Sequence, residues 1–234
     1  RYGGSQYINS PGTGQYEDHV VKELVPYIDG RFRTVAKAAG RAVMGKSSGG
    51  YGSLVLAMRH ADVFGHCVSH SGDTLFELSY GADFPKCVNA LKAYDGKFKG
   101  FLDAFAASRE KESMPHELIN MAGMASCYSP NPKSPLGFDL PFDTHTGETV
   151  PAVFERWLAH DPVRLAAKHV KALKSLRTLY FDCGTKDEFF LHMGARALSR
   201  ELKRLKVAHV HEEHGGGHFG IGDRYDVGFA RLKA

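Results

Sequence analysis

The sequence predicts an α/β fold with a mainly parallel sheet flanked by helices. Three observations predict it: short apolar segments that end near glycine, longer segments with apolar residues at helical spacing, and alternation of the two along the chain. Strands that alternate with helices of this length imply crossover connections between parallel neighbours. The chain has 234 residues, of which 43% are hydrophobic and 26 are glycine. This is enough for one packed core with many tight turns.

The first predicted elements are a helix, a strand and a second helix. Apolar residues recur at helical spacing over residues 16–32, with Pro26 as the place of a kink. Residues 41–45 form a short apolar run ended by glycine, which is typical of a buried parallel strand. Residues 49–60 have apolar side chains on one side of a helix.

Three more strands and one helix are predicted further along. Residues 66–70 and 207–211 are short strands, and residues 189–205 are a helix with leucines at spacings of three and four. Residues 176–183 are the clearest strand because they are β-branched and aromatic and are followed by Gly184. The sequence therefore places four strands.

Residues 75–160 interrupt the alternation. They contain a helical patch at residues 88–105 and a proline-rich, strand-poor run at 128–135. A long excursion inside an α/β domain is usually a lid or cap that contacts substrate. We therefore expect a core of residues 1–74 and 161–234 and a lid of residues 75–160. The alternative is an irregular surface insertion without a catalytic role.

Charge and hydropathy exclude several classes. Lys and Arg number 30 and Asp and Glu 26, so the net charge of +4 predicts neither a nucleic-acid partner nor a polybasic membrane anchor. No window approaches the roughly 20 apolar residues of a membrane span, and the first residues lack a signal-peptide pattern. Because the chain does not begin with Met, a segment that precedes it is one expectation. The compartment, cytoplasmic or secreted, stays open.

The four cysteines, Cys67, Cys87, Cys127 and Cys183, are far apart and form no CxxC pair. They predict neither a zinc knuckle nor a redox motif. Buried free thiols are expected, and disulfides remain the alternative.

Residues 45–50, Gly-Lys-Ser-Ser-Gly-Gly, form a GxSxG motif between a predicted strand and a predicted helix. In a nucleophile elbow of this kind the serine has a strained backbone, and small residues two before and two after it let strand and helix approach. Gly45 and Gly49 meet that demand, and Ser47 is the candidate nucleophile. The backbone N–H of Ser48 would face an oxyanion at the helix N-terminus. The alternative is a glycine-rich helix start without chemistry.

A serine hydroxyl needs an acid and a base, which follow it in that order in this arrangement. Asp187 comes just after the clearest strand, at the sheet edge where active sites of parallel sheets form. Asp182 is expected to lie in the strand and face a structural partner, and Glu188 is a third choice. His218, presented by three glycines, is the candidate base, with His214 as the alternative. Both histidines would otherwise be exposed loop residues.

A metal site is the rival chemistry. His209 and His211 alternate onto one strand face and, with His214 or His218, could bind zinc, nickel or copper. No HExxH pairing is present, and we expect neither a metal nor a cofactor.

Three further residues are candidates for substrate binding. Lys46 either contacts an acidic substrate or is a solvated lysine. Phe142 and Trp157 either line an acyl or aromatic pocket or pack in a core.

At these motifs the sequence resembles the esterase D-like branch of the α/β-hydrolases. This group contains S-formylglutathione hydrolases, feruloyl and acetyl-xylan esterases, and mycolyltransferases. The resemblance is carried by residues 5–11, 16–18, 26–29, 45–52 and 157–162, and Asp187 and His218 match the family's acid and base by position. Lys46 and Ser48 depart from the bulky residue and the Met that are common there.

The resemblance implies an α/β-hydrolase fold and also a departure from it. In this family several strands precede the elbow strand, and a loop among them supplies a second oxyanion donor. Here only 40 residues, interpreted as loop and helix, precede the strand of residues 41–45, so its hydrophobic edge is expected to be unpaired. Either a preceding segment or a partner chain, such as a second copy in a homodimer, is expected to cover it.

The predicted function is that of a serine carboxylesterase acting on a small-molecule ester through an acyl-enzyme. Ser47 would attack, His218 would transfer the proton, and Asp187 would orient the imidazole. An acyltransferase with the same three residues, and a catalytically impaired fragment or binding module, are the alternatives. Acyl and alcohol specificity stay open.

Overall fold

The computed structural model describes residues 4–232, so the first three and last two residues of the expected core lie outside the described residues. The chain divides into two compact units. The helical unit comprises Asn9–Gln15 and Tyr80–Ala159, with the described part of Arg1–Ser5. The sheet unit comprises Gln6–Ile8, Tyr16–Ser79 and His160–Ala234. The interpretation of residues 75–160 as a lid stays a prediction.

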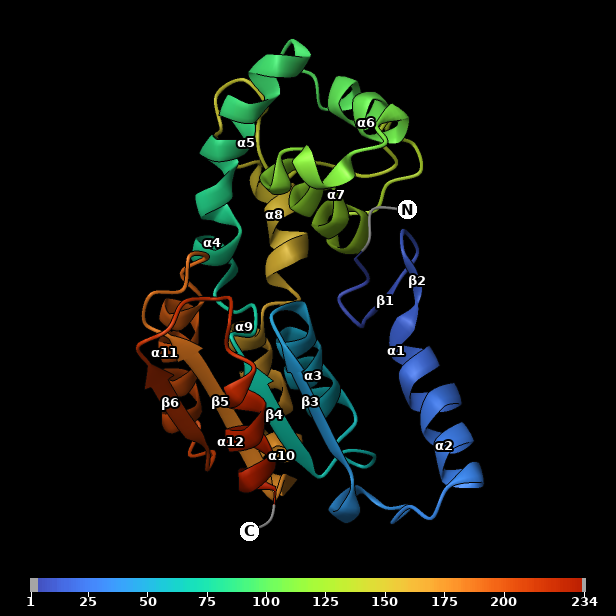
Figure 1. The fold of residues 1–234 in the computed structure, drawn as a ribbon, viewed down its shortest axis with the longest axis vertical. Helices are drawn as coiled ribbons and strands as arrows, with labels where there is room; N and C mark the ends of the chain where they lie inside the picture. Colours follow the sequence, from blue (N-terminus) through green and yellow to red (C-terminus); the bar gives the residue numbers. More distant parts are fainter. Residues whose placement is uncertain (1–3, 233–234) are drawn as a thin grey trace. The chain divides into compact units, whose positions relative to one another are not determined.

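The sheet unit is built on four parallel strands, which confirms the predicted fold class. They follow the order β3-β4-β5-β6 (Figure 1) and are β3 (Ala42–Lys46), β4 (His66–His70), β5 (Thr178–Gly184) and β6 (Val210–His214). In register, Lys46 pairs with His70, His70 with Asp182 and Gly184 with His214. The carboxyl ends of all four strands therefore lie at the same end of the sheet. The loops that follow them carry polar residues.

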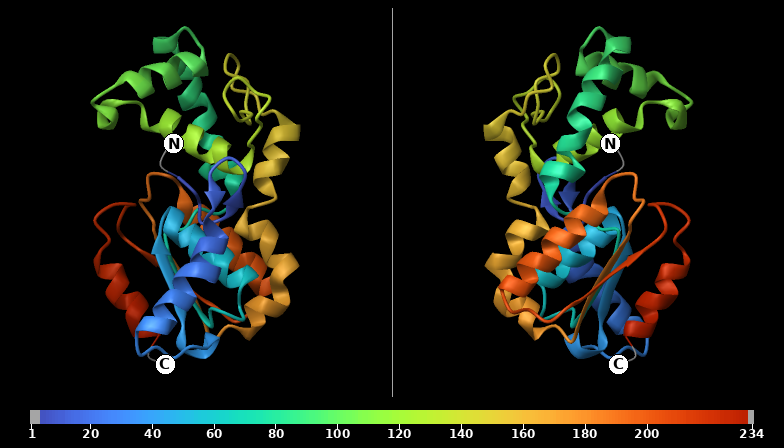
Figure 2. Two further views of the ribbon diagram at one scale, coloured as in Figure 1. Left: turned by 90° about the vertical axis from the view of Figure 1, so that its right-hand side faces the viewer. Right: turned by 90° about the vertical axis from the view of Figure 1, so that its left-hand side faces the viewer.

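Helices cover both faces of this sheet. On one face lie α3 (Ser48–Arg59) and α11 (Leu191–Arg204), with α9 (Pro162–Ala166) and α10 (Val170–Ser175) packed beside them; α12 (Asp223–Arg231) covers the other face (Figures 1 and 2). A Cβ at Gly228 would lie 2.9 Å from His70 Nε2, so α12 approaches the sheet closely only because this residue is glycine.

Asp161 ties α9 to the loop before α4 (Phe76–Ser79). Its carboxylate accepts the backbone N–H groups of Val163, at the start of α9, and of Leu75 and Phe76. The side chain is fully buried, and burial raises the pKa of its carboxyl. One residue therefore caps a helix and closes a loop that lies far from it in the sequence.

The predicted start of the last strand, residue 207, is wrong by three residues. Lys206 has a φ of +55°, and the N–H groups of Lys206 and Val207 donate to the carbonyls of Lys203 and Leu202. This is the hydrogen-bond pattern that closes a helix with a left-handed residue. Residues 206–207 therefore end α11, and the strand begins only at Val210.

The predicted helix over residues 16–32 is present as one helical segment, but its middle is not α-helical. The segment consists of α1 (Tyr16–Asp18), a π-helix (His19–Leu24) and α2 (Val25–Arg31), with Pro26 in the first turn of α2. Proline supplies no N–H and crowds the preceding turn, which a wider π turn accommodates. No side chain of the π-helix or of α2 is buried.

The sheet ends at β3. Among the described residues β3 pairs with β4 on one side and with no strand on the other, as expected of this edge. The chain before it does contain a small antiparallel pair that was not predicted, β1 (Asn9–Ser10) with β2 (Gly14–Gln15), which belongs to the helical unit. A 3₁₀ turn, Ala38–Gly40, leads into β3.

The helical unit has an aromatic core. Its main helices are α5 (Phe84–Leu91), α6 (Phe98–Ala107), α7 (His116–Tyr128) and α8 (Pro151–Leu158). The helical patch predicted at residues 88–105 is two helices, because Asp95 and Gly96 take positive φ values of 54° and 70° between them. The proline-rich run of residues 128–135 contains no strand beyond an isolated bridge of Pro130 with Phe138, as its strand-poor pattern predicted.

The four cysteines are buried and free, which confirms the expected thiols. Burial raises the pKa of Cys67 and of Cys127 to about 12, so both are protonated at neutral pH. No helix in the described part of the chain is long and apolar enough to cross a membrane.

Candidate active site

Ser47 occupies a sharp turn between β3 and α3. Its φ of 57° and ψ of −126° lie in a region that residues other than glycine rarely adopt. Two hydrogen bonds of 2.9 Å hold the turn: Ser47 N–H donates to the His70 carbonyl, and Tyr51 N–H donates to the Ser47 carbonyl. The strained backbone expected at this serine is therefore present, and β4 anchors it.

Close packing explains two of the glycines around this turn. A Cβ at Gly45 would lie 2.4 Å from the backbone of Gly49, so Gly45 is required as expected. The same expectation for Gly49 is wrong, because a Cβ there would meet nothing within 4 Å. Gly50, which the motif did not single out, is the second tight position: a Cβ would lie 2.8 Å from the His70 carbonyl oxygen.

Ser47, His218 and Asp187 form one hydrogen-bonded chain. His218 Nε2 lies 3.0 Å from Ser47 Oγ, and His218 Nδ1 lies 2.8 Å from Asp187 Oδ2. An ionised carboxylate only accepts hydrogen bonds, so the proton of the neutral imidazole is assigned to Nδ1 and the Nε2 lone pair faces the hydroxyl. His218 and Asp187 are 3% and 2% exposed.

The Asp187 carboxylate is fixed from several sides. Oδ1 accepts the N–H groups of Phe189 at 2.9 Å and Leu191 at 3.4 Å, and Cys183 Sγ lies 3.5 Å from Oδ2. Burial raises the pKa of this carboxyl, but the hydrogen bonds and charge of His218 and the two backbone donors outweigh it and hold the pKa below its usual range. Asp187 is therefore anionic at neutral pH.

The loop that carries His218 rests on the loop after β5. Glu188 accepts the backbone N–H of His218 at 2.6 Å, and a Cβ at Gly217 would collide with the Glu188 carboxylate. Glu188 thus holds the histidine's backbone rather than its ring. His214, the alternative base, accepts the N–H of Gly216 through Nδ1 at 3.2 Å and stabilises the turn.

Asp182 faces structural partners, as expected. Its fully buried carboxylate accepts hydrogen bonds from His70 Nδ1 and Tyr180 Oη at 2.8 Å and from Arg224 Nε at 2.9 Å. Sequence reasoning missed His70, Arg224 and Tyr180. His70 ends β4 and pairs in register with Asp182 of β5, but nothing local in the sequence fixes the register of two strands so far apart.

Ser48 is the first residue of α3. Its N–H therefore has no acceptor four residues earlier in the helix, and it lies at the positive end of the helix dipole. An oxyanion role for this N–H stays a prediction.

The other substrate-binding candidates lie in two different settings. Lys46 Nζ is 5.2 Å from the ring centroid of Phe219. Trp157 is fully buried in the helical unit, where its Nε1 donates to Ser129 Oγ at 2.8 Å, and Phe142 is 2% exposed and stacks on Phe84. These contacts favour core packing for both aromatic residues, and a role in substrate binding stays a prediction.

The histidines of the rival metal site have other contacts. His209 and His211 do share one face, where both stack on Phe181 at centroid distances of 5.6 and 5.0 Å. His209 Nε2 is hydrogen-bonded to Ser199 Oγ. Within residues 4–232 no group of three or more His, Cys, Asp or Glu side chains is placed to hold a metal ion.

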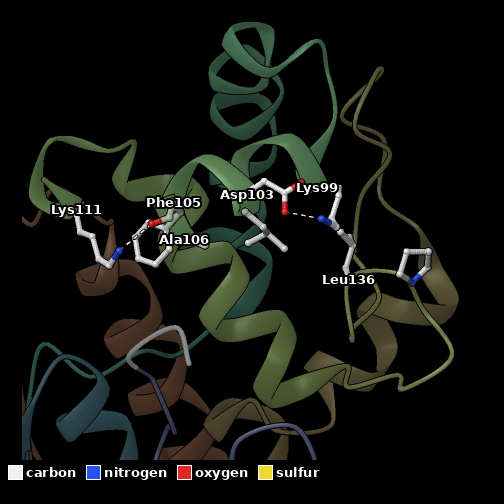
Figure 3. A pocket seen from close by; sticks show the side chains of 8 residues that line it. Lys99, Asp103, Phe105, Ala106, Lys111 and Leu136 are labelled. Carbon is white, nitrogen blue, oxygen red and sulfur yellow. Dashed lines mark hydrogen bonds and ion pairs between the residues drawn. The ribbon is translucent and has the colours of Figure 1, made fainter. Parts of the chain in front are cut away.

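A cavity of about 430 Å³ lies in the helical unit (Figure 3). Its cationic side chains are already bonded: Lys99 pairs with Asp103, and Lys111 donates to the carbonyl oxygens of Phe105 and Ser108. The residues that line it include no serine or cysteine beside a histidine.

A known protein family matches this chain over most of its length. A family model described as putative esterase matches residues 5–220. The protein named Esterase Rv1288 of Mycobacterium tuberculosis (strain ATCC 25618 / H37Rv) is 37% identical over 70 residues, which are 30% of this chain and 15% of that protein.

Two solved structures share the fold. A ferulic acid esterase superposes with a TM-score of 0.55 at 18% identity, over 97% of this chain and 62% of the other. The Staphylococcus aureus protein FphF, titled a fluorophosphonate-binding serine hydrolase, gives a TM-score of 0.57 at 19% identity, over 98% and 66%. The chain thus spans about two thirds or less of the length of each of these proteins.

Proposed function

Because this chain belongs to the putative esterase family and has the α/β-hydrolase fold, we propose that it is a serine carboxylesterase. One observation carries the proposal: Ser47 Oγ, the His218 ring and the Asp187 carboxylate are joined by hydrogen bonds of 3.0 and 2.8 Å at the carboxyl ends of the sheet. A nucleophile, a general base and an orienting acid in this geometry are the parts that acyl transfer needs.

In the first half-reaction, Ser47 Oγ attacks the ester carbonyl carbon while His218 Nε2 takes the hydroxyl proton. Asp187 stabilises the imidazolium that forms. The carbonyl oxygen becomes an oxyanion, to which the N–H of Ser48 donates; such a donor is worth about 3 kcal/mol. The C–O bond to the alcohol then breaks, the alcohol leaves with the proton from His218, and the acyl group stays on Ser47.

In the second half-reaction, water replaces the alcohol. His218 Nε2 takes a proton from water, whose oxygen attacks the acyl carbon. The bond to Ser47 Oγ breaks, Oγ recovers a proton from His218, and a carboxylic acid leaves. Because Asp187 is anionic at neutral pH, it stabilises the charged imidazole twice in each turnover.

The backbone at Ser47 supports this assignment. Its positive φ exposes the side chain at a sharp bend, and the hydrogen bond from Ser47 N–H to His70 fixes the bend. Strain of this kind persists where the surrounding structure enforces it and is concentrated at functional sites. A glycine-rich helix start without chemistry would have no need of a non-glycine residue in this conformation.

The test is hydrolysis of p-nitrophenyl esters by the Ser47→Ala variant. Loss of the nucleophile is expected to lower kcat by about 10⁴-fold or more, while the thermal unfolding transition is kept. Ser53→Ala, in the same helix, is the matched control and is expected to hydrolyse the esters. A folded Ser47→Ala variant with normal activity would contradict the proposal.

The same three residues would also serve an acyltransferase, in which an alcohol or sugar replaces water in the second half-reaction. Mass spectrometry of reactions with added alcohols or sugars separates the two. Free acid as the main product supports the esterase; transesterified product in excess of free acid supports the transferase. A folded protein that forms neither product would favour a binding module.

A further inference from the structure

The side chain of Lys46 lies beside the proposed reaction centre. Lys46 directly precedes Ser47, and Phe219 directly follows His218. Lys46 Nζ is 5.2 Å from the centroid of the Phe219 ring. The residue before Ser47 thus contacts the residue after His218, while Ser47 and His218 are themselves joined by a hydrogen bond. The ammonium group therefore lies against a ring that itself contacts the His218 ring.

Two phenyl rings flank the imidazole at this point. The Phe189 and Phe219 rings lie 4.8 and 5.1 Å from the His218 ring, at interplanar angles of 77° and 82°. Phe219 is 67% exposed, a large apolar area for a residue beside a buried histidine. The rim around His218 is thus apolar, with the Lys46 ammonium against one of its rings.

The acidic groups near this rim are bonded elsewhere. Asp187 is hydrogen-bonded to the His218 ring and Glu188 to the His218 backbone N–H. None of the ion pairs in the described part of the chain includes Lys46. A ring face attracts an ammonium without neutralising its charge. Lys46 therefore remains a cation that can attract an anion.

We propose that Lys46 selects ester substrates that carry a carboxylate near the scissile bond, while the Phe189 and Phe219 rings contact the apolar part of the same substrate. The inference rests on the proposed esterase function and names its substrate class. The carboxylate belongs either to the acyl chain or to the alcohol, and in both cases it would form a charge-assisted hydrogen bond with the ammonium.

Two pairs of substrates that differ in charge test this inference. For the acyl side they are p-nitrophenyl hexanoate and the p-nitrophenyl half-ester of adipic acid. For the alcohol side they are 4-acetoxybenzamide and 4-acetoxybenzoate. In each pair the quantity measured is the ratio of kcat/KM for the anionic ester to kcat/KM for the neutral one.

The variants are Lys46→Met, Lys46→Arg and a control, Lys171→Met. Lys171 is an exposed lysine of the sheet unit. It lies on α10, which precedes the amino end of β5, whereas Ser47 lies at the carboxyl ends of the strands. In at least one pair the ratio is expected to fall about tenfold or more in Lys46→Met, which is typical of a lost charge-assisted bond. The wild-type ratio is expected to persist in Lys46→Arg and Lys171→Met.

A measurement on the unaltered protein is independent of how the variants fold. Because salt screens charges, 0.5 M NaCl should lower the anionic-to-neutral ratio of the wild type relative to low salt. The pair that responds shows whether the carboxylate belongs to the acyl chain or to the alcohol.

Ratios that stay within twofold of the wild type in Lys46→Met for both pairs, with no response to salt, would overturn the inference. Lys46 would then be a solvated lysine, and ester hydrolysis that depends on Ser47 would still stand. Failure of the esterase function itself is a different result: the wild type would hydrolyse neither member of either pair.

Discussion

Ser47, Asp187 and His218 were assigned from the sequence because each follows a local signal: a GxSxG motif between strand and helix, a carboxylate after a strong strand, and a histidine after three glycines. The hydrogen bond from the His218 backbone to Glu188 joins residues 30 positions apart in the sequence. No local pattern predicts such a contact, because it depends on how two loops meet. The spacing of the glycines in the GxSxG motif could also not show that Gly50, rather than Gly49, is the second tightly packed glycine.

Asp187→Asn tests which carboxylate orients the histidine. An amide at this position would favour the wrong imidazole tautomer, and in the serine protease template that change costs about 10⁴-fold in kcat. We expect a loss of similar size here in p-nitrophenyl ester hydrolysis. Asp182→Asn is the comparison variant. If Asp182→Asn were folded and inactive while Asp187→Asn kept full activity, the assignment of the two carboxylates would be reversed.

At the scale of elements, β3, β4 and β5 were predicted well because they are short and lie next to glycine. The helical segment over residues 16–32 was predicted as well, but its π-helical middle was not, because side-chain spacing does not show where an α-helix widens into a π turn. The start of β6 was placed three residues too early because a lysine, Lys206, takes the left-handed position after α11 where glycine is usual. Both errors concern backbone geometry that side-chain patterns do not record.

Gly45→Ala and Gly49→Ala form a matched pair for the packing of α3 on β3. A Cβ at Gly45 would overlap the Gly49 backbone, so we expect Gly45→Ala to lower the free energy of unfolding by about 1–3 kcal/mol. A Cβ at Gly49 would meet open space, and alanine is favoured over glycine in a helix. Gly49→Ala should therefore raise the free energy of unfolding by at most about 1 kcal/mol. Urea denaturation measures both. Equal effects would contradict the close approach of strand and helix.

The Asp182 network should make stability depend on pH. Burial raises the pKa of the Asp182 carboxyl, but hydrogen bonds from His70, Tyr180 and Arg224 outweigh it, so that the folded-state pKa lies below the ordinary value of about 4. The carboxylate's contribution is then complete above about pH 4 and is lost as the pH falls through the folded-state pKa.

Asp182→Asn is therefore expected to cost about 3 kcal/mol at pH 7, because it leaves Arg224 and His70 without a buried anion. The difference between variant and wild type in the free energy of unfolding should shrink toward pH 3. Denaturant titrations at several pH values measure it. A difference that does not change with pH would show that the network does not depend on the charge of Asp182.

At the scale of the whole molecule, the sequence predicted the four parallel strands and the free edge at β3. It could not predict the packing of the helical unit, because its core is built from aromatic contacts between distant segments, such as Phe84 with Phe142 and Tyr80 with Trp157. It also gave no hint that Asn9–Gln15 belongs to that unit.

The apolar surface next to the β3 edge should cause self-association. Leu24, Ile28, Val35 and Ala42 are among the residues that line a cavity of about 270 Å³. Five apolar side chains of the segment before β3 are 42–62% exposed: Leu24, Tyr27, Ile28, Phe32 and Val35. Exposed apolar surface beside an unpaired strand invites association. Light scattering that rises with protein concentration should fall in Ile28→Lys but persist in Leu78→Lys, which changes a 40% exposed leucine on α4. Equal scattering from both variants would show that this surface is not responsible.

The most direct test of the central claim is covalent labelling with a fluorophosphonate, read by mass spectrometry of the digested protein. This reagent reacts with a serine that an adjacent base has activated. We predict one phosphonylated peptide, modified at Ser47 and absent when His218→Gln removes the base that lies 3.0 Å from the hydroxyl. A folded protein that remains unlabelled at Ser47, or that is labelled equally with and without His218, would contradict the assignment.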